Sequence, residues 1–112
     1  MIESHDEFID EFQGRMLDAK LVGKVRVEFS PTDVERLISL DLIETDPEHR
    51  RQGLGDDALR LICELADNCG FAVQVIPKNI NGPMRDEELV AWYAQHGFRV
   101  SMMRRDPRHT GA

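Results

Sequence analysis

Two arginines, a glutamine and two glycines stand together just before an apolar, helix-like segment, in the run Arg50-Arg51-Gln52-Gly53-Leu54-Gly55. Glycine lets the backbone approach a ligand closely because it has no Cβ. The first N–H groups of a helix lack partners within the helix, and the helix macrodipole adds positive charge at the same end. The run therefore predicts an anion site, for which a phosphate or pyrophosphate is the natural occupant.

A second motif lies further along the chain, where a predicted helix stops at a glycine and a strand begins with phenylalanine. It reads Trp92-Tyr93-Ala94-Gln95-His96-Gly97-Phe98. Together the two motifs resemble the GNAT superfamily of acyl-CoA N-acyltransferases. The first resembles its coenzyme A pyrophosphate loop, Gln/Arg-x-x-Gly-x-Gly/Ala, and the second its aromatic-Tyr-x-x-x-Gly-Phe. They occur in the family's order, with a helix and a strand between them, and the resemblance covers residues 36–103.

The resemblance implies an N-acetyltransferase, in which a primary amine directly attacks the thioester of acetyl-CoA. The backbone N–H groups from Gln52 to Asp56 would hold the pyrophosphate, and Arg50 or Arg51 would add positive charge. The Asp56 side chain is expected to point away from the phosphate. The strand end before the loop would hold the pantetheine arm by backbone bonds. The expected coenzyme-binding residues are Ile43, Glu44, Thr45, Arg50, Arg51, Gln52, Gly53, Leu54, Gly55, Asp56 and Asn79.

Tyr93 and Glu44 are the candidate catalytic residues. In many relatives a tyrosine at this position protonates the leaving thiolate. A phenol, with a pKa of about 10, can do so only if it is well positioned, because the proton affinities of the two groups are similar. A carboxylate at Glu44 would accept the amine proton, with Glu28 on the neighbouring strand as the alternative. Each of these side chains also has a structural interpretation, as a packed tyrosine and as ordinary surface acids. Histidine is the side chain suited to proton transfer near neutral pH, which makes His49 and His96 further candidates, but solvated loop or helix-end positions are expected for both.

Apolar residues at helical or alternating spacing predict the elements that must position these groups. The expected order is helix 3–17 with Ser4 as N-cap, strand 22–29, a turn at 30–33, strand 34–45, helix 54–68 stopped by Gly70, strand 71–76, helix 86–96 and strand 98–103. The first two strands should be antiparallel, and strand 71–76 should run parallel to its predecessor. This order predicts an α/β fold with a mixed sheet. It is a single domain, with residues 1–20 as an N-terminal helix, 22–103 as the core and 104–112 as a frayed tail.

The sequence departs from the family pattern in three ways. Asp86 stands where many relatives have a coenzyme-binding asparagine, and an ionised carboxylate donates no hydrogen bond. Asn79 is the candidate substitute. The core is expected to be truncated in the N-terminal substrate segment, where one helix stands for a strand and two helices. The family's last strand is also expected to be missing, so a homodimer that covers the open edge is a hypothesis.

Composition bounds the remaining choices. The chain has 112 residues, a net charge of −7 and 31% charged residues. This charge disfavours binding to nucleic acid, and no apolar run is long enough for a membrane span. A cytoplasmic location is the expectation, with Cys63 and Cys69 reduced. No Cys or His spacing predicts a metal site, and acetyl-CoA is the expected co-substrate.

Two function classes stay open. The first is the N-acetyltransferase, whose acceptor is an unidentified small-molecule or protein amine. The second is a non-catalytic module of the same fold that binds acyl-CoA or a protein, which Asp86 and the short acceptor region favour. A nucleotide-binding protein fits poorly, because the loop lacks the Gly-Lys-Ser/Thr of a P-loop and a third fingerprint glycine.

Overall fold

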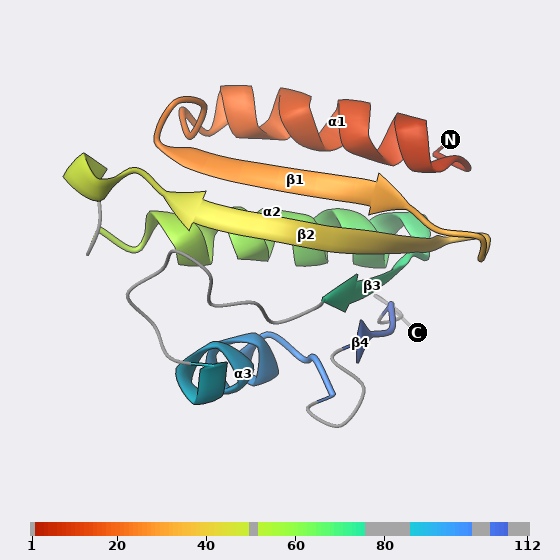
Figure 1. Ribbon diagram of the computed structural model, residues 1–112. Coiled ribbons are helices and arrows are strands. Elements are labelled where there is room, and N and C mark those ends of the chain that lie inside the picture. The colour runs from red at the N-terminus through yellow and green to blue at the C-terminus, as the bar shows by residue number, and fades with distance from the viewer. Residues whose placement is uncertain (1, 50–51, 76–85, 100–103, 108–112) are drawn as a thin grey trace.

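The computed structural model describes residues 2–49, 52–75, 86–99 and 104–107 (Figure 1). Its elements in chain order are α1 (His5–Asp18), β1 (Val25–Pro31), β2 (Leu37–Thr45), the short 3₁₀ helix η1 (Pro47–His49), α2 (Leu54–Cys69), β3 (Ala72–Val75), α3 (Asp86–Gln95) and β4 (Arg104–Arg105). This is the expected order of helices and strands up to α3.

The strands form one mixed sheet in the order β1-β2-β3-β4. Strands β1 and β2 are antiparallel, and β3 runs parallel to β2 with Leu37 opposite Ala72 and Leu40 opposite Val75. Strand β4 is antiparallel to β3. The mixed α/β sheet and both predicted strand directions are therefore confirmed. Strand β2 continues to Thr45, five residues beyond its last described pair with β3.

Helix α1 begins where the sequence predicts. Ser4 is its N-cap, and the Ser4 hydroxyl accepts a hydrogen bond of 3.2 Å from the Glu7 backbone N–H. The Ser4 hydroxyl also donates to the Glu7 carboxylate at 3.0 Å. These bonds satisfy an N–H that the helix itself leaves unpaired.

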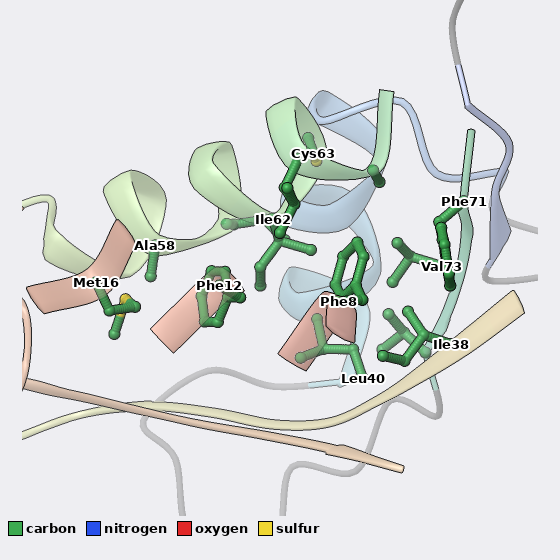
Figure 2. Close-up of a cluster of buried hydrophobic side chains, with 14 of the residues drawn as sticks. Phe8, Phe12, Met16, Ile38, Leu40, Ala58, Ile62, Cys63, Phe71 and Val73 are labelled. Carbon is green, nitrogen blue, oxygen red and sulfur yellow. The ribbon is translucent and has the colours of Figure 1, made fainter. Parts of the chain in front are cut away.

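Helices α1 and α2 pack on one face of the sheet and enclose the core with it. Figure 2 shows the side chains of α1 meeting those of α2 and of β2 and β3. Phe8 and Phe12 both make edge-to-face contacts with Phe29 of β1, at centroid distances of 5.7 and 5.2 Å. The fully buried large side chains are Phe8, Phe71, Ile38, Leu40, Leu59, Ile62, Leu65 and Val73.

An irregularity in the β1–β2 ladder changes which side chains of β2 face this core. Glu28 is paired with Leu42 and Phe29 with Leu40, so Asp41 is an extra residue on β2. A bulge of this kind shifts the alternation of faces by one residue. As a result Leu40 and Ile43 both face the helices, opposite Phe29 and Val27 of β1.

The C-terminal segment differs from the prediction. Residues 104–105 form strand β4 instead of part of a frayed tail, and Arg105 is buried, with 3% of its surface exposed. Its guanidinium binds the Asp67 carboxylate of α2 with two hydrogen bonds of 2.8 and 2.9 Å. The expected strand 98–103 is represented by an isolated bridge between Arg99 and Arg104, and residues 100–103 lie outside the described residues. Pairing with β3 and the ion pair with α2 hold this segment, and neither is encoded by local spacing.

The predicted turn after β1 also lies two residues later than expected. Pro31 is the last residue of β1, opposite Ile38, rather than a turn residue. A proline is compatible with this position because it ends an edge strand, the kind of strand in which sheets tolerate proline.

Candidate active site

Gly53 shapes the start of α2. It has φ +74° and ψ 14°, in the left-handed region, and no side chain caps the helix at this position. The first bond within the helix is donated by the Asp57 N–H to the Gly53 carbonyl, at 3.0 Å. The N–H groups of Leu54, Gly55 and Asp56 therefore have no acceptor within the helix. These three donors, with the macrodipole of a 16-residue helix behind them, fit an anionic group.

Gly55 is the point where three elements converge. A Cβ added there would lie 3.3 Å from the Thr45 hydroxyl oxygen, at the end of β2. It would also lie 3.7 Å from the ring of Trp92 on α3. The absence of a side chain at Gly55 therefore lets the strand end, the loop and α3 pack together.

The Asp56 carboxylate connects the loop to α3. It accepts a hydrogen bond from the indole Nε1–H of Trp92, and its Oδ1 lies 3.4 Å from Nε2 of His96. The Asp56 side chain is 48% exposed and that of His96 is 17% exposed. The carboxylate is thus engaged by α3, which agrees with the expectation that it plays no part in holding an anion.

The Tyr93 side chain extends from α3 into the hydrophobic core. Only 5% of its surface is exposed, and its ring packs against Trp92 at 5.0 Å and Phe98 at 5.3 Å between centroids. Burial raises the pKa of Tyr93 to about 12, because an apolar environment penalises the phenolate. Within the described part of the chain, the Tyr93 hydroxyl has no hydrogen-bond partner. The side chain is therefore a neutral phenol at physiological pH and a packed core residue.

The bulge at Asp41 determines which side chains at the end of β2 face the helices. Ile43 and Thr45 lie opposite Val27 and Val25 and face the helices, whereas Glu44 lies opposite Arg26 on the other face of the sheet. All three residues of this strand end are partly exposed.

The two candidate bases flank the same arginine. Glu44 is the cross-strand neighbour of Arg26, and Glu28 forms an ion pair with Arg26 at 2.5 Å. No hydrogen bond joins the side chains of Glu44 and Tyr93 in the described part of the chain. The catalytic roles of Tyr93 and Glu44 therefore stay predictions.

The remaining predicted site residues fall into two groups. Gln52 is exposed next to Gly53, at the mouth of the loop. Arg50, Arg51 and Asn79 lie outside the described residues, so their predicted contacts with the coenzyme stay predictions.

The two histidines near the loop differ in their surroundings. His49 ends η1, and its backbone N–H donates to the Asp46 carbonyl at 2.8 Å. His96 is not the solvated helix-end residue that was expected, because its ring is largely covered and lies 6.0 Å from the ring of Trp92. The motif spacing contained no signal for this contact with Asp56, because the partners are 40 residues apart.

The described part of the chain was also searched for metal sites and for membrane-spanning helices. It contains no group of three His, Cys, Asp or Glu side chains arranged to hold a metal ion. None of its helices combines the length and apolar character needed to cross a bilayer.

Comparison with known proteins gives one result at family level. The family described as "Acetyltransferase (GNAT) family" matches residues 3–98. The match includes the start of α2 and the whole of α3. Searches of curated proteins and of solved structures gave no match.

Proposed function

Because the chain belongs to the GNAT family of acetyltransferases, we propose that it transfers an acetyl group from acetyl-CoA to a primary amine. Family membership gives acyl-CoA-dependent acetyltransferase chemistry, whereas the acetyl donor, the amine acceptor and direct attack are the proposal. One observation carries it. The start of α2 offers free N–H groups beside the end of β2 and the helix that bears Tyr93.

In this proposal the coenzyme pyrophosphate binds the N–H groups of Leu54, Gly55 and Asp56, and the pantetheine arm follows the backbone of β2 at Ile43 to Thr45. The left-handed Gly53 supports this assignment, because among the described residues, apart from its chain neighbours, no atom lies within 4 Å of the position where a Cβ would stand. The backbone is therefore open to a ligand at the mouth of the loop.

The chemical step moves two protons. The amine nitrogen attacks the thioester carbonyl carbon, the bond to sulfur breaks, and the leaving thiolate takes the Tyr93 hydroxyl proton. The proton lost by the amine passes to Glu44. Direct attack is supported by the two cysteines, neither of which forms a disulfide. Burial raises the pKa of the Cys69 thiol, and the Cys63 side chain is buried. A thiol held neutral is a poor nucleophile for a covalent acyl intermediate.

The burial of Tyr93 also favours the second candidate, a non-catalytic module that binds acyl-CoA. A phenol with a pKa of about 12 is a weaker acid than an ordinary thiol, whose pKa is about 8.5. Proton transfer to the thiolate is then uphill unless the thiolate is desolvated too. Tyr93→Phe separates the two candidates.

For Tyr93→Phe we expect kcat to fall by about 10²- to 10⁴-fold, the usual contribution of a positioned acid. Coenzyme affinity and the melting temperature should stay unchanged, because the phenylalanine ring fills the same packed position. The assay follows release of the CoA thiol from acetyl-CoA in the presence of a panel of primary amines. Equal turnover in both proteins would remove Tyr93 from the mechanism, and absence of turnover in both would favour the binding module.

Calorimetric titration tests the coenzyme site itself, with acetyl-CoA, CoA and a free nucleotide as ligands. We expect micromolar binding of both coenzyme forms and loss of binding in Gly53→Glu, whose carboxylate would enter the open space at the loop. Gly70→Glu is the matched control, because Gly70 has nearly the same φ, +71° against +74°, at the other end of α2. Absence of binding to the folded wild-type protein, or equal loss in both variants, would contradict the site.

The location and the assembly belong to the same proposal. We propose that the protein acts in the cytoplasm and forms a homodimer, since β1 and β4 end the described sheet and edge strands offer unpaired backbone groups. Light scattering at tens of micromolar decides the assembly, and the mass of a single chain would contradict the dimer.

A further inference from the structure

Two attachments hold the Trp92–His96 segment against α2, one of them partly through Arg105 of β4. The backbone carbonyl of His96 accepts hydrogen bonds from the Arg105 Nε at 2.8 Å and from the Cys63 thiol at 3.9 Å. The indole of Trp92 and the imidazole of His96 both reach the Asp56 carboxylate. The first attachment lies near the middle of α2, and the second lies in its first turn.

The second attachment belongs to the residue that also forms the loop. The Asp56 backbone N–H has no acceptor within α2 and faces the proposed pyrophosphate site, while the Asp56 carboxylate accepts the Trp92 hydrogen bond. Trp92 in turn packs over Gly55 and against Tyr93, with 5.0 Å between the Trp92 and Tyr93 ring centroids. A continuous set of contacts therefore runs from the loop to the proposed acid.

We propose that Asp56 is a positioning residue, whose carboxylate fixes α3 against the first turn of α2 and so couples coenzyme occupancy to the placement of Tyr93. The coupling of Asp56 to catalysis rests on the proposed acetyltransferase function, whereas its fixing of Trp92 does not. A carboxylate near a bound pyrophosphate is electrostatically unfavourable, so affinity for the coenzyme does not explain this aspartate. The contacts with Trp92 and His96 do.

The first-turn neighbour Asp57 provides the matched control. It has the same charge and the same favourable position relative to the helix dipole, but its carboxylate pairs with Arg60 of α2 itself, at 3.6 Å. Asp56→Ala and Asp57→Ala therefore remove the same charge, and only the first removes the link to α3. Asp56→Asn removes the charge but keeps an oxygen that can accept the Trp92 hydrogen bond.

Trp92 is the chain's one tryptophan, so its fluorescence reports this contact without any turnover. In the ligand-free protein we expect the emission of Asp56→Ala to shift to longer wavelength, and that of Asp57→Ala and Asp56→Asn to stay close to wild type. Addition of CoA should change Trp92 emission in wild type and Asp57→Ala. In Asp56→Ala this change should be lost, although calorimetry still detects CoA binding with a Kd within about threefold of wild type.

In the acetyl-CoA assay we expect kcat of Asp56→Ala to fall at least tenfold with little change in KM. Asp56→Asn should recover most of the rate, and Asp57→Ala should behave as wild type. Trp92→Phe removes the donor from the other side of the contact. The double variant with Asp56→Ala should therefore be no slower than either single variant.

Several results would overturn the proposal. It fails if Asp56→Ala and Asp57→Ala have the same emission spectra, if Asp56→Ala keeps the full response to CoA, or if the effects of Asp56→Ala and Trp92→Phe simply multiply. If wild type binds no CoA, the proposed function fails, and the ligand-free emission of the two alanine variants still decides whether Asp56 fixes Trp92. If Asp56→Ala does not fold, the same comparison is made between Asp56→Asn and Trp92→Phe in kcat, where equal losses would exclude rescue by the retained acceptor.

Discussion

The far half of α2 and its first turn hold the C-terminal part of the chain in opposite ways. Arg105 and Asp67 form a doubly hydrogen-bonded pair with side-chain exposures of only 3% and 14%. At the first turn, the Asp56 side chain is 48% exposed and accepts a hydrogen bond from Trp92, and its Oδ1 lies 3.4 Å from Nε2 of His96, whose side chain is 17% exposed. One attachment is dry and bidentate, whereas the other is partly open to solvent.

The two attachments therefore differ in how much each contributes to the free energy of unfolding and in how easily each can be broken. Removing one partner of a buried pair costs about 3–5 kcal/mol, whereas exposed pairs contribute about 0–1 kcal/mol. The Arg105–Asp67 contact, whose loss would destabilise the fold most, therefore lies away from the proposed coenzyme loop. The contact at the loop contributes little enough free energy that binding of a ligand can change it.

The largest effect is expected when the buried Arg105–Asp67 pair is broken. Arg105→Ala should lower the free energy of unfolding by about 3–5 kcal/mol, because the Asp67 carboxylate is left with a partner missing in a buried site. The hydrogen bond to Asp67 also raises the pKa of the Arg105 guanidinium, so the arginine is charged at every accessible pH. Urea unfolding followed by circular dichroism measures the loss.

Arg104→Ala is the control for this prediction. Arg104 belongs to the same short strand and pairs with Asp106 at 2.9 Å, but both side chains are substantially exposed, at 37% and 50%. Its loss should cost less than about 1 kcal/mol. Similar losses for the two arginines would remove the contrast between buried and exposed attachments.

The next expected effect is a dependence of the free energy of unfolding on pH, caused by the buried phenol of Tyr93. Tyr93 is the single tyrosine, so absorbance at the phenolate band should titrate near pH 12 in the folded protein and near pH 10 when it is unfolded. Since the folded pKa is the higher one, the unfolded state loses its proton first as pH rises. The free energy of unfolding should therefore be unaffected by Tyr93 below pH 10. It should fall by about 1.4 kcal/mol per pH unit from about 10 to about 12.

Tyr93→Phe is the control for this titration, because it should abolish that part of the alkaline loss of stability. A folded-state midpoint near pH 10 would mean that the phenol is solvated, and the argument from its burial would then fail.

The smallest effect concerns two glycines with opposite requirements. Gly53→Ala should cost about 1–2 kcal/mol, because an L-residue is strained at φ +74°. Gly14→Ala should instead stabilise by about 0.5–1 kcal/mol, since Gly14 lies inside α1 with open space around its Cβ position. Thermal unfolding of both variants checks the signs. Stabilisation by Gly53→Ala would mean that the loop does not need the left-handed conformation.

Much of the framework was predictable because its causes are local. Ser4, Gly53 and Gly70 mark helix ends through capping and left-handed backbone conformations, which depend on a few neighbouring residues. Apolar periodicity similarly predicted α2 and the antiparallel pair β1–β2. Strand β4 was not predictable, because two arginines become a strand only through pairing with β3.

The candidate site divides in the same way. The sequence by itself determined the glycine loop, the helix behind it and the position of Tyr93 in the next helix, since glycine geometry and helical spacing act over a few residues. Only the tertiary structure decided that a bulge sends Glu44 to the face opposite Thr45, that Tyr93 is desolvated, and that Asp56 binds Trp92. These features depend on contacts between residues up to 40 positions apart, whose geometry is set by packing of the whole core rather than by local preference.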